Sequence, residues 1–147
     1  RSNGVYAFGA GSWGRLGQGG DSRDKHVPTK IKAAEHLGPI SQVAAGFEHS
    51  LILTADGSAY QFGRMGSSYA STPNPVTNLG ASCGVRVSAI AAGKGYNIAV
   101  DDSGEVYVWG AMGQNGAIGL GEKDGVKIKN ARLPTRIDSL EGRTITQ

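Results

Sequence analysis

Short stretches of the chain alternate between apolar residues and smaller or polar ones, with the period of an extended strand. Residues 51–54 (Leu-Ile-Leu-Thr) and 98–101 (Ile-Ala-Val-Asp) put successive side chains on opposite faces. Asp56-Gly57 and Ser103-Gly104 follow these two stretches. Such pairs predict tight hairpin turns, because glycine adopts a positive φ without a Cβ clash.

The strand expected after each turn carries two aromatic residues at period two. Residues 3–9 show the same turn and strand near the start of the chain. Prolines mark one further strand in each unit, in residues 28–31, 75–76 and 134–137. Proline lacks a backbone N–H, so we expect these to be edge strands. The aromatic pairs are Tyr6 and Phe8, Tyr60 and Phe62, and Tyr107 and Trp109.

The predicted strands belong to a block that recurs. Residues 43–63 and residues 90–110 follow one scheme, from an Ala-Ala-Gly segment to a closing aromatic-Gly pair. Gly46 and Gly93, which end the Ala-Ala-Gly segments, are 47 positions apart. A period of that size indicates an array of units that bury apolar faces against their neighbours. We interpret the glycines at equivalent places as structural turn and packing positions: Gly9, Gly46, Gly57, Gly63, Gly93, Gly104 and Gly110.

About four short strands per unit, joined by turns, describe a propeller blade. We therefore predict an all-β fold, a partial β-propeller of two to three four-stranded blades over residues 1–147. The predicted units are a repeat tail (1–9), two repeats (10–63 and 64–110) and an incomplete repeat (111–147). The only helix that we expect lies around residues 30–37. Both ends cut through a unit, so we expect a piece of a longer protein, with the remaining blades supplied by the same polypeptide or another chain.

The repeated block resembles the repeat of the regulator of chromosome condensation family. The glycine-rich section after the first strand and the segment Val-Ala-Ala-Gly-x-x-His-Ser-Leu-x-Leu-Thr-x-Asp-Gly at 43–57 both match it. The second unit departs from the family's repeat pattern, because residues 63–75 lack the Leu-Gly-x-Gly run. The resemblance implies that this chain supplies two to three blades of a seven-bladed ring. The matching glycine-rich residues are Gly11, Gly14, Leu16, Gly17 and Gly19.

The resemblance also implies candidate binding residues. In the chromatin-bound member of that family, one propeller face catalyses nucleotide exchange on the small GTPase Ran, with acidic and histidine residues in loops after the Ala-Gly step. The corresponding residues here are Glu48, His49, Lys94 and Tyr96. Only Glu48 and His49 carry the expected chemistry. A histidine at the place of His49 also ties its turn together by hydrogen bonds in this repeat, so a structural role stays open.

Charge adds a second candidate surface. The formal net charge of +3 permits an acidic partner without indicating nucleic acid. Basic residues concentrate in loops 21–32 and 122–136, which we expect to form one positive patch for an acidic protein or a phosphate backbone. Ordinary solvated loop charge is the alternative. Neither loop has an aromatic residue to stack bases, which argues against single-strand binding. The candidate residues are Arg23, Lys25, Lys127, Lys129 and Arg132.

Two short motifs suggest catalysis but lack the context that it needs. Residues 9–14 spell the Gly-x-Gly-x-x-Gly dinucleotide fingerprint, yet the glycines and Pro28 that follow disfavour the required helix. Residues 80–84 spell the nucleophile-elbow pattern, yet strand-like residues follow and no histidine lies beyond His49. We interpret both as turns of the repeat and predict no catalytic residue and no cofactor.

The few metal-binding and redox-active residues are equally uninformative. The histidines and the single cysteine lack zinc-type spacing, so we predict no metal site. Cys83 alone cannot form an internal disulfide, which leaves the nucleus and the cytoplasm open as compartments. No apolar run is long enough to cross a membrane. The histidines and the cysteine considered as metal ligands are His26, His36, His49 and Cys83.

Loops at the rims of a propeller tend to carry its binding function. The leading prediction is a non-enzymatic scaffold that presents rim loops to a protein partner, such as a large assembly. The alternatives are a guanine-nucleotide exchange factor for a Ran-like small GTPase and a chromatin-binding module that acts through the basic loops.

Overall fold

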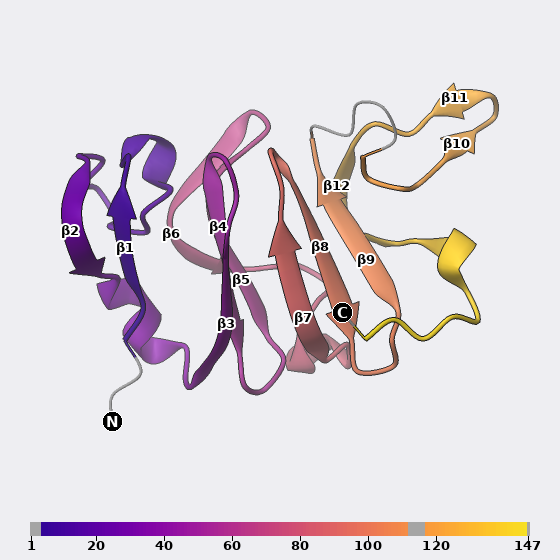
Figure 1. The fold of residues 1–147 in the computed structure, drawn as a ribbon, viewed down its shortest axis with the longest axis horizontal. Helices are drawn as coiled ribbons and strands as arrows, with labels where there is room; N and C mark the ends of the chain where they lie inside the picture. The colour runs from indigo at the N-terminus through magenta and orange to yellow at the C-terminus, as the bar shows by residue number, and fades with distance from the viewer. Residues whose placement is uncertain (1–3, 112–116, 147) are drawn as a thin grey trace.

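The computed structural model describes residues 4–111 and 117–146, and these residues are nearly all β (Figure 1). The strands are β1 (Tyr6–Gly9), β2 (Lys25–Lys30), β3 (Ile40–Ala45), β4 (His49–Thr54), β5 (Ala59–Met65), β6 (Ser68–Pro75), β7 (Val87–Ala92), β8 (Tyr96–Asp101), β9 (Val106–Gly110), β10 (Glu122–Lys123), β11 (Val126–Lys127) and β12 (Ala131–Arg136).

The strands form two complete blades and part of a third. One four-stranded antiparallel sheet has the order β3-β4-β5-β6, and the other has the order β12-β9-β8-β7. The pair β1-β2 corresponds in sequence and pairing to β5-β6, so it is the outer half of a blade. Figure 1 shows these sheets side by side along the molecule. The predicted all-β partial propeller with four-stranded blades is confirmed.

Equivalent turns use the same hydrogen bond with donor and acceptor exchanged. After β4, the Thr54 hydroxyl donates to Asp56 Oδ1 at 2.5 Å. After β8, the Ser103 hydroxyl donates to Asp101 Oδ1 at 2.6 Å. Hydroxyl and carboxylate have therefore changed places between the repeats while the turn has kept its cross-link.

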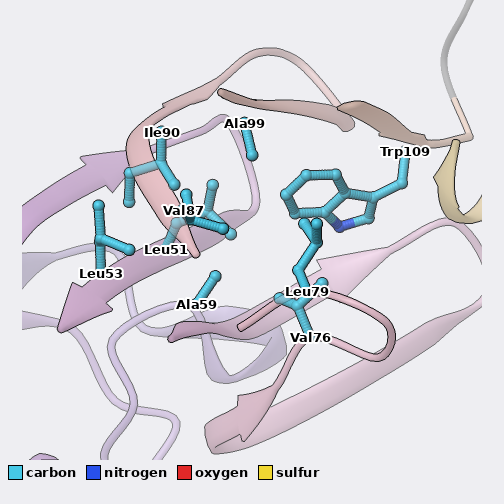
Figure 2. Close-up of a cluster of buried hydrophobic side chains, with 9 residues drawn as sticks. All are labelled: Leu51, Leu53, Ala59, Val76, Leu79, Val87, Ile90, Ala99 and Trp109. Atoms are coloured by element: carbon cyan, nitrogen blue, oxygen red, sulfur yellow. The ribbon is translucent and has the colours of Figure 1, made fainter. Parts of the chain in front are cut away.

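The main core lies between the two complete sheets, where β3 and β4 face β7. Leu51 and Leu53 of β4 point into it, as their alternation predicts. In Figure 2 the indole of Trp109 projects from β9 into this cluster. Its nine buried members are Leu51, Leu53, Ala59, Val76, Leu79, Val87, Ile90, Ala99 and Trp109.

A second core lies between β1-β2 and the β3–β6 sheet. Ile52, on the opposite face of β4 from its two leucine neighbours, packs there with Ile31, Ala34 and Phe62. The strand β4 is therefore covered on both faces. This explains its continuous run of apolar residues.

The three equivalent aromatic residues occupy the same place in successive sheets but differ in burial. Phe62 is 3% exposed and Trp109 is 2% exposed, whereas Phe8 is 67% exposed. Phe62 and Trp109 each face the sheet that precedes their own. No sheet precedes β1 among residues 4–111 and 117–146, so Phe8 faces outward.

The segments predicted as a helix or as motif-bearing turns each contain one short 3-10 segment. The helix expected around residues 30–37 is a single 3-10 segment, Lys32–His36, which follows β2 directly. The fingerprint section contains only the 3-10 turn Ser12–Gly14, and the elbow section contains only the 3-10 turn Ala81–Cys83. No helix in the described part of the chain is long and apolar enough to span a membrane.

Candidate functional site: the upper rim

The loops with the candidate residues gather along one edge of the sheets, at the top of Figure 1. In antiparallel blades the first-to-second and third-to-fourth connections lie at the same edge. We call this edge the upper rim; it comprises residues 10–24, 46–48, 66–67, 93–95 and 117–130, with the side chains at the adjoining strand ends. The predicted residues Glu48 and Lys94 both lie on it.

A connected row of aromatic and charged side chains crosses the upper rim. The Arg64 guanidinium carbon lies 4.6 Å from the centroid of the Trp13 ring. Trp13 also meets Tyr69 edge to face, with ring centroids 6.1 Å apart. On the other side of Arg64, Glu48 lies between two arginines, 3.7 Å from Arg64 Nη1 and 3.8 Å from Arg15 Nη2. Glu48, inferred from sequence, therefore lies within a cluster whose other members were not.

The neighbouring loops form a second aromatic–cation pair. Lys94 Nζ lies 5.5 Å from the centroid of the exposed Phe47 ring. The Phe47 amide donates to the carbonyl of Gly93 at 3.3 Å, which joins the two equivalent loops. Tyr96 lies below, with its half-buried ring against Gly93.

His49 does not reach the rim surface. Its side chain is buried between the sheets at 1% exposure, and its Nε2 lies 2.7 Å from the side-chain amide of Asn97. The amide of Asn97 fits when its nitrogen donates to Nε2 and its oxygen accepts from Trp109 Nε1 at 3.1 Å, while Nδ1 of His49 is buried without a partner among the described residues. Trp109 Nε1 also donates to Gln61 at 2.8 Å. A buried polar chain thus links the two sheets, and His49 acts structurally in this geometry.

Because His49 is buried as a neutral ring, it should make the fold acid-sensitive. Burial lowers the pKa of His49, and the amide N–H that Asn97 donates to Nε2 favours the same neutral ring. The unfolded chain then takes up a proton that the folded chain resists. The free energy of unfolding should therefore fall as the pH drops below about 6.5 and level off below the folded pKa. Urea denaturation at about pH 7.5 and about pH 5 measures this, and His49→Gln should flatten the dependence. An unchanged pH dependence in His49→Gln would contradict the assignment.

The two basic loops do not form one patch. They belong to β1-β2 and to the β9–β12 connection, with the β3–β6 sheet between them, and Figure 1 shows them at opposite ends. In the first loop, Arg23 and Lys25 both bond to Asp21, at 2.8 and 2.6 Å, and hold the pKa of that carboxyl well below its usual range. The expectation of a combined patch on adjacent blades is therefore wrong. Lys127, Lys129 and Arg132 are exposed at the other end.

Sequence inspection missed the hairpin β10-β11 and the cluster around Trp13. The hairpin had a signal in Asp124-Gly125, two residues with positive φ at the turn between strands. The sequence signal for Trp13 was weaker: it is a large aromatic residue among glycines. Arg64 and Tyr69 had no signal in the sequence, because only the pairing of β5 with β6 puts them side by side.

Comparison with known proteins agrees with this architecture. A model described as the regulator of chromosome condensation (RCC1) repeat matches residues 2–53 and 103–147, and a second model of that repeat matches residues 40–68 and 87–117. The chain belongs to the RCC1 repeat family.

Among the described residues, no group of three or more His, Cys, Asp or Glu side chains could hold a metal ion.

Similar proteins in this family have diverse names. The chain is 32% identical to the ultraviolet-B receptor UVR8 of Arabidopsis thaliana, over 97% of this chain and 32% of that protein. It is 32% identical to Protein RCC1 of Candida albicans, over 92% of this chain and 33% of that protein. It is 33% identical to the E3 ubiquitin-protein ligase HERC2 of Homo sapiens, over 97% of this chain and 3% of that protein. The chain thus spans a third or less of the length of these relatives.

The solved structures support the propeller fold. The crystal structure of Prp20p from Saccharomyces cerevisiae, described with its binding properties to Gsp1p and histones, superposes with a TM-score of 0.76 at 25% identity. The match covers 92% of this chain and 34% of Prp20p. Yeast RCC1 (Prp20) bound to Kap60 gives the same TM-score at 26% identity, over 92% of this chain and 33% of that one.

Proposed function

We propose that this chain is a non-enzymatic interaction module that presents its upper rim to a protein partner. The observation that carries the proposal is the exposure of three large aromatic side chains on that rim, Trp13, Phe47 and Tyr69. Each lies beside a cation or another aromatic ring. Exposed aromatic residues next to arginine are the composition enriched at energetic centres of protein interfaces.

The geometry of the repeat supports this role. Two inter-sheet cores fix the strands, so the rim loops are held on a rigid scaffold. The similar structures of Prp20 are described with protein partners, which are Gsp1p and histones in one case and Kap60 in the other.

Site-specific photo-crosslinking tests this proposal. A photoreactive residue is placed at Phe47 on the upper rim or, as a matched control, at the exposed Ala81 in the β6–β7 connection on the opposite edge. We expect saturable crosslinking to a protein partner from position 47 and little from position 81. Equal crosslinking from both positions, or crosslinking from position 81 alone, would contradict a rim-specific role.

A second candidate function is nucleotide exchange on a small GTPase. Glu48 supports it, as an acidic side chain on the upper rim, and so does the similarity to a protein described as binding Gsp1p. Lys94 and Tyr96 weaken it, because they replace acidic and histidine side chains at the equivalent loop. Release of a labelled nucleotide from a Ran-type GTPase measures the activity, and Glu48→Ala should slow it about tenfold or more. No acceleration by the unmodified chain would remove this candidate.

A further inference from the structure

Trp13 has a backbone conformation that packing within the chain does not account for. Its φ is +62°, in the left-handed region that side chains with a Cβ rarely adopt. Its side chain is nevertheless 45% exposed, so burial of the indole offsets little of this strain. Strained residues that surrounding structure holds in place cluster at binding and active sites.

The loop around Trp13 is firmly anchored. The Gly11 amide donates to Asp24 at 2.9 Å, and the Gly19 amide donates to the carbonyl of Ser71 on β6 at 2.9 Å. Gly14 lies so close to the backbone of Ser71 that an added Cβ would approach within 2.7 Å. The indole is therefore held in place before any partner arrives, which lowers the entropic cost of binding.

The side chains around the indole leave one cationic group, Arg64, available. Arg64 donates one hydrogen bond, from Nε to the carbonyl of Gly66 at 3.1 Å, and its approach to Glu48 is a loose 3.7 Å. Arg15 approaches the same carboxylate at 3.8 Å, but its guanidinium also donates to Ser12 and to the carbonyl of Phe47, so it is largely engaged within the chain. Two guanidinium groups thus share one carboxylate, so this part of the rim has a surplus positive charge.

We propose that the Trp13 cluster, defined as Trp13, Arg64, Tyr69 and Arg15, docks an acidic protein segment that carries an apolar or aromatic anchor residue. The anchor packs against the exposed edges of the Trp13 and Tyr69 rings. A carboxylate of the segment pairs with the guanidinium group of Arg64, whose planar donors suit carboxylate oxygens, and the charge of Arg15 adds to the attraction. This inference rests on the proposed function, because it assigns the partner class and the anchor point on the same rim.

The ring geometry favours a protein segment over a nucleic acid. Single strands bind by stacking successive bases on aromatic faces along a basic groove. Here the Trp13 and Tyr69 planes are 69° apart, and one face of Trp13 already carries Arg64. Glu48 beside Arg64 would also repel a continuous run of phosphates.

Peptide display against the chain tests this proposal. A random peptide library panned on the immobilised chain should enrich sequences with several Asp or Glu residues around an aromatic or large apolar residue. Trp13→Gly removes the ring but suits the left-handed backbone, so it should fold at least as stably as the unmodified chain. It should bind the enriched peptides about tenfold more weakly or worse, as should Arg64→Ala. Arg143→Ala is the matched control and should bind normally, because Arg143 is an exposed arginine close to Ile145, which bonds to the Gly104 turn at the opposite edge.

The outcomes separate this inference from the broader proposal. Acidic peptides whose affinity is unaffected by Trp13→Gly and Arg64→Ala would overturn the Trp13 cluster as their site, while the rim crosslinks from position 47 could still stand. Enrichment of basic peptides, or binding of a single-stranded oligonucleotide pool that depends on Trp13, would overturn the partner class. Failure of crosslinking at position 47 together with failure to enrich any peptide would overturn both proposals.

Discussion

Trp109→Ala is expected to lower the free energy of unfolding by about 3–5 kcal/mol, the usual cost of truncating a large buried aromatic side chain. The indole is 2% exposed and fills the core between the two complete sheets. Its Nε1–H donates to Gln61 across the same interface, at 2.8 Å. The substitution therefore leaves a cavity and an unpaired amide oxygen at the junction that holds the blades together. Urea denaturation monitored by circular dichroism measures the change.

Phe8→Ala is the matched control, because Phe8 occupies the equivalent place in the first strand and is 67% exposed. Phe8→Ala should lower the free energy of unfolding by less than about 1 kcal/mol, as surface substitutions away from packed sites usually do. A loss as large as that of Trp109→Ala would mean that the two aromatic residues are not distinguished by a preceding sheet. The account of the inter-sheet cores would then be wrong.

Gly110→Ala should be destabilising by about 2–5 kcal/mol, for two reasons that add. A Cβ at the φ of +136° is strained, at a cost of about 1–2 kcal/mol. The Cβ would also overlap the carbonyl oxygen of Gly95 and approach the Cα of Tyr96 within 2.5 Å. These are backbone atoms of the first residue of the paired strand β8 and of the residue before it, which cannot turn aside as a side chain could. Overpacking of this kind costs about 1–3 kcal/mol.

Gly9→Ala separates the two contributions. Gly9 closes the equivalent strand with a φ of +103°, but a Cβ there would meet no atom within 4 Å. It should show only the backbone strain of about 1–2 kcal/mol. Equal losses at positions 9 and 110, again by urea denaturation, would show that close approach of the paired strands contributes nothing.

Much of the fold could be predicted from the sequence because the determinants are local and repeated. Alternation in residues 51–54 fixed which β4 side chains face each neighbouring sheet, and Asp56-Gly57 fixed the turn that follows. Each determinant occurs twice or more, so the copies support one another. The exchange of hydroxyl and carboxylate between Thr54 and Asp101 shows that the turn, rather than one residue type, is what recurs.

The upper rim was harder to predict because its contacts join residues with no shared pattern. Arg64 reaches Trp13 only because the loop after β1 folds over the β5-β6 hairpin of the next sheet. The resemblance identified Glu48 as a rim residue but could not show that two arginines engage it. The number of cations in the two basic loops wrongly predicted one positive patch. It takes no account of the sheet that lies between the loops, or of the pairing of Arg23 and Lys25 with Asp21.

Three pairs of residues 48 positions apart are hydrogen-bonded across the sheet interface: Gln42 with Ile90, His49 with Asn97, and Gln61 with Trp109. They express the central claim that successive repeats stack in register and thereby align their rim loops. Nuclear Overhauser effects in solution test it most directly. The account predicts cross-peaks from the Trp109 indole N–H to the Gln61 side chain and from the His49 ring to the Asn97 amide. Their absence in a folded sample, with the indole instead contacting residues of its own sheet alone, would contradict the stacked arrangement.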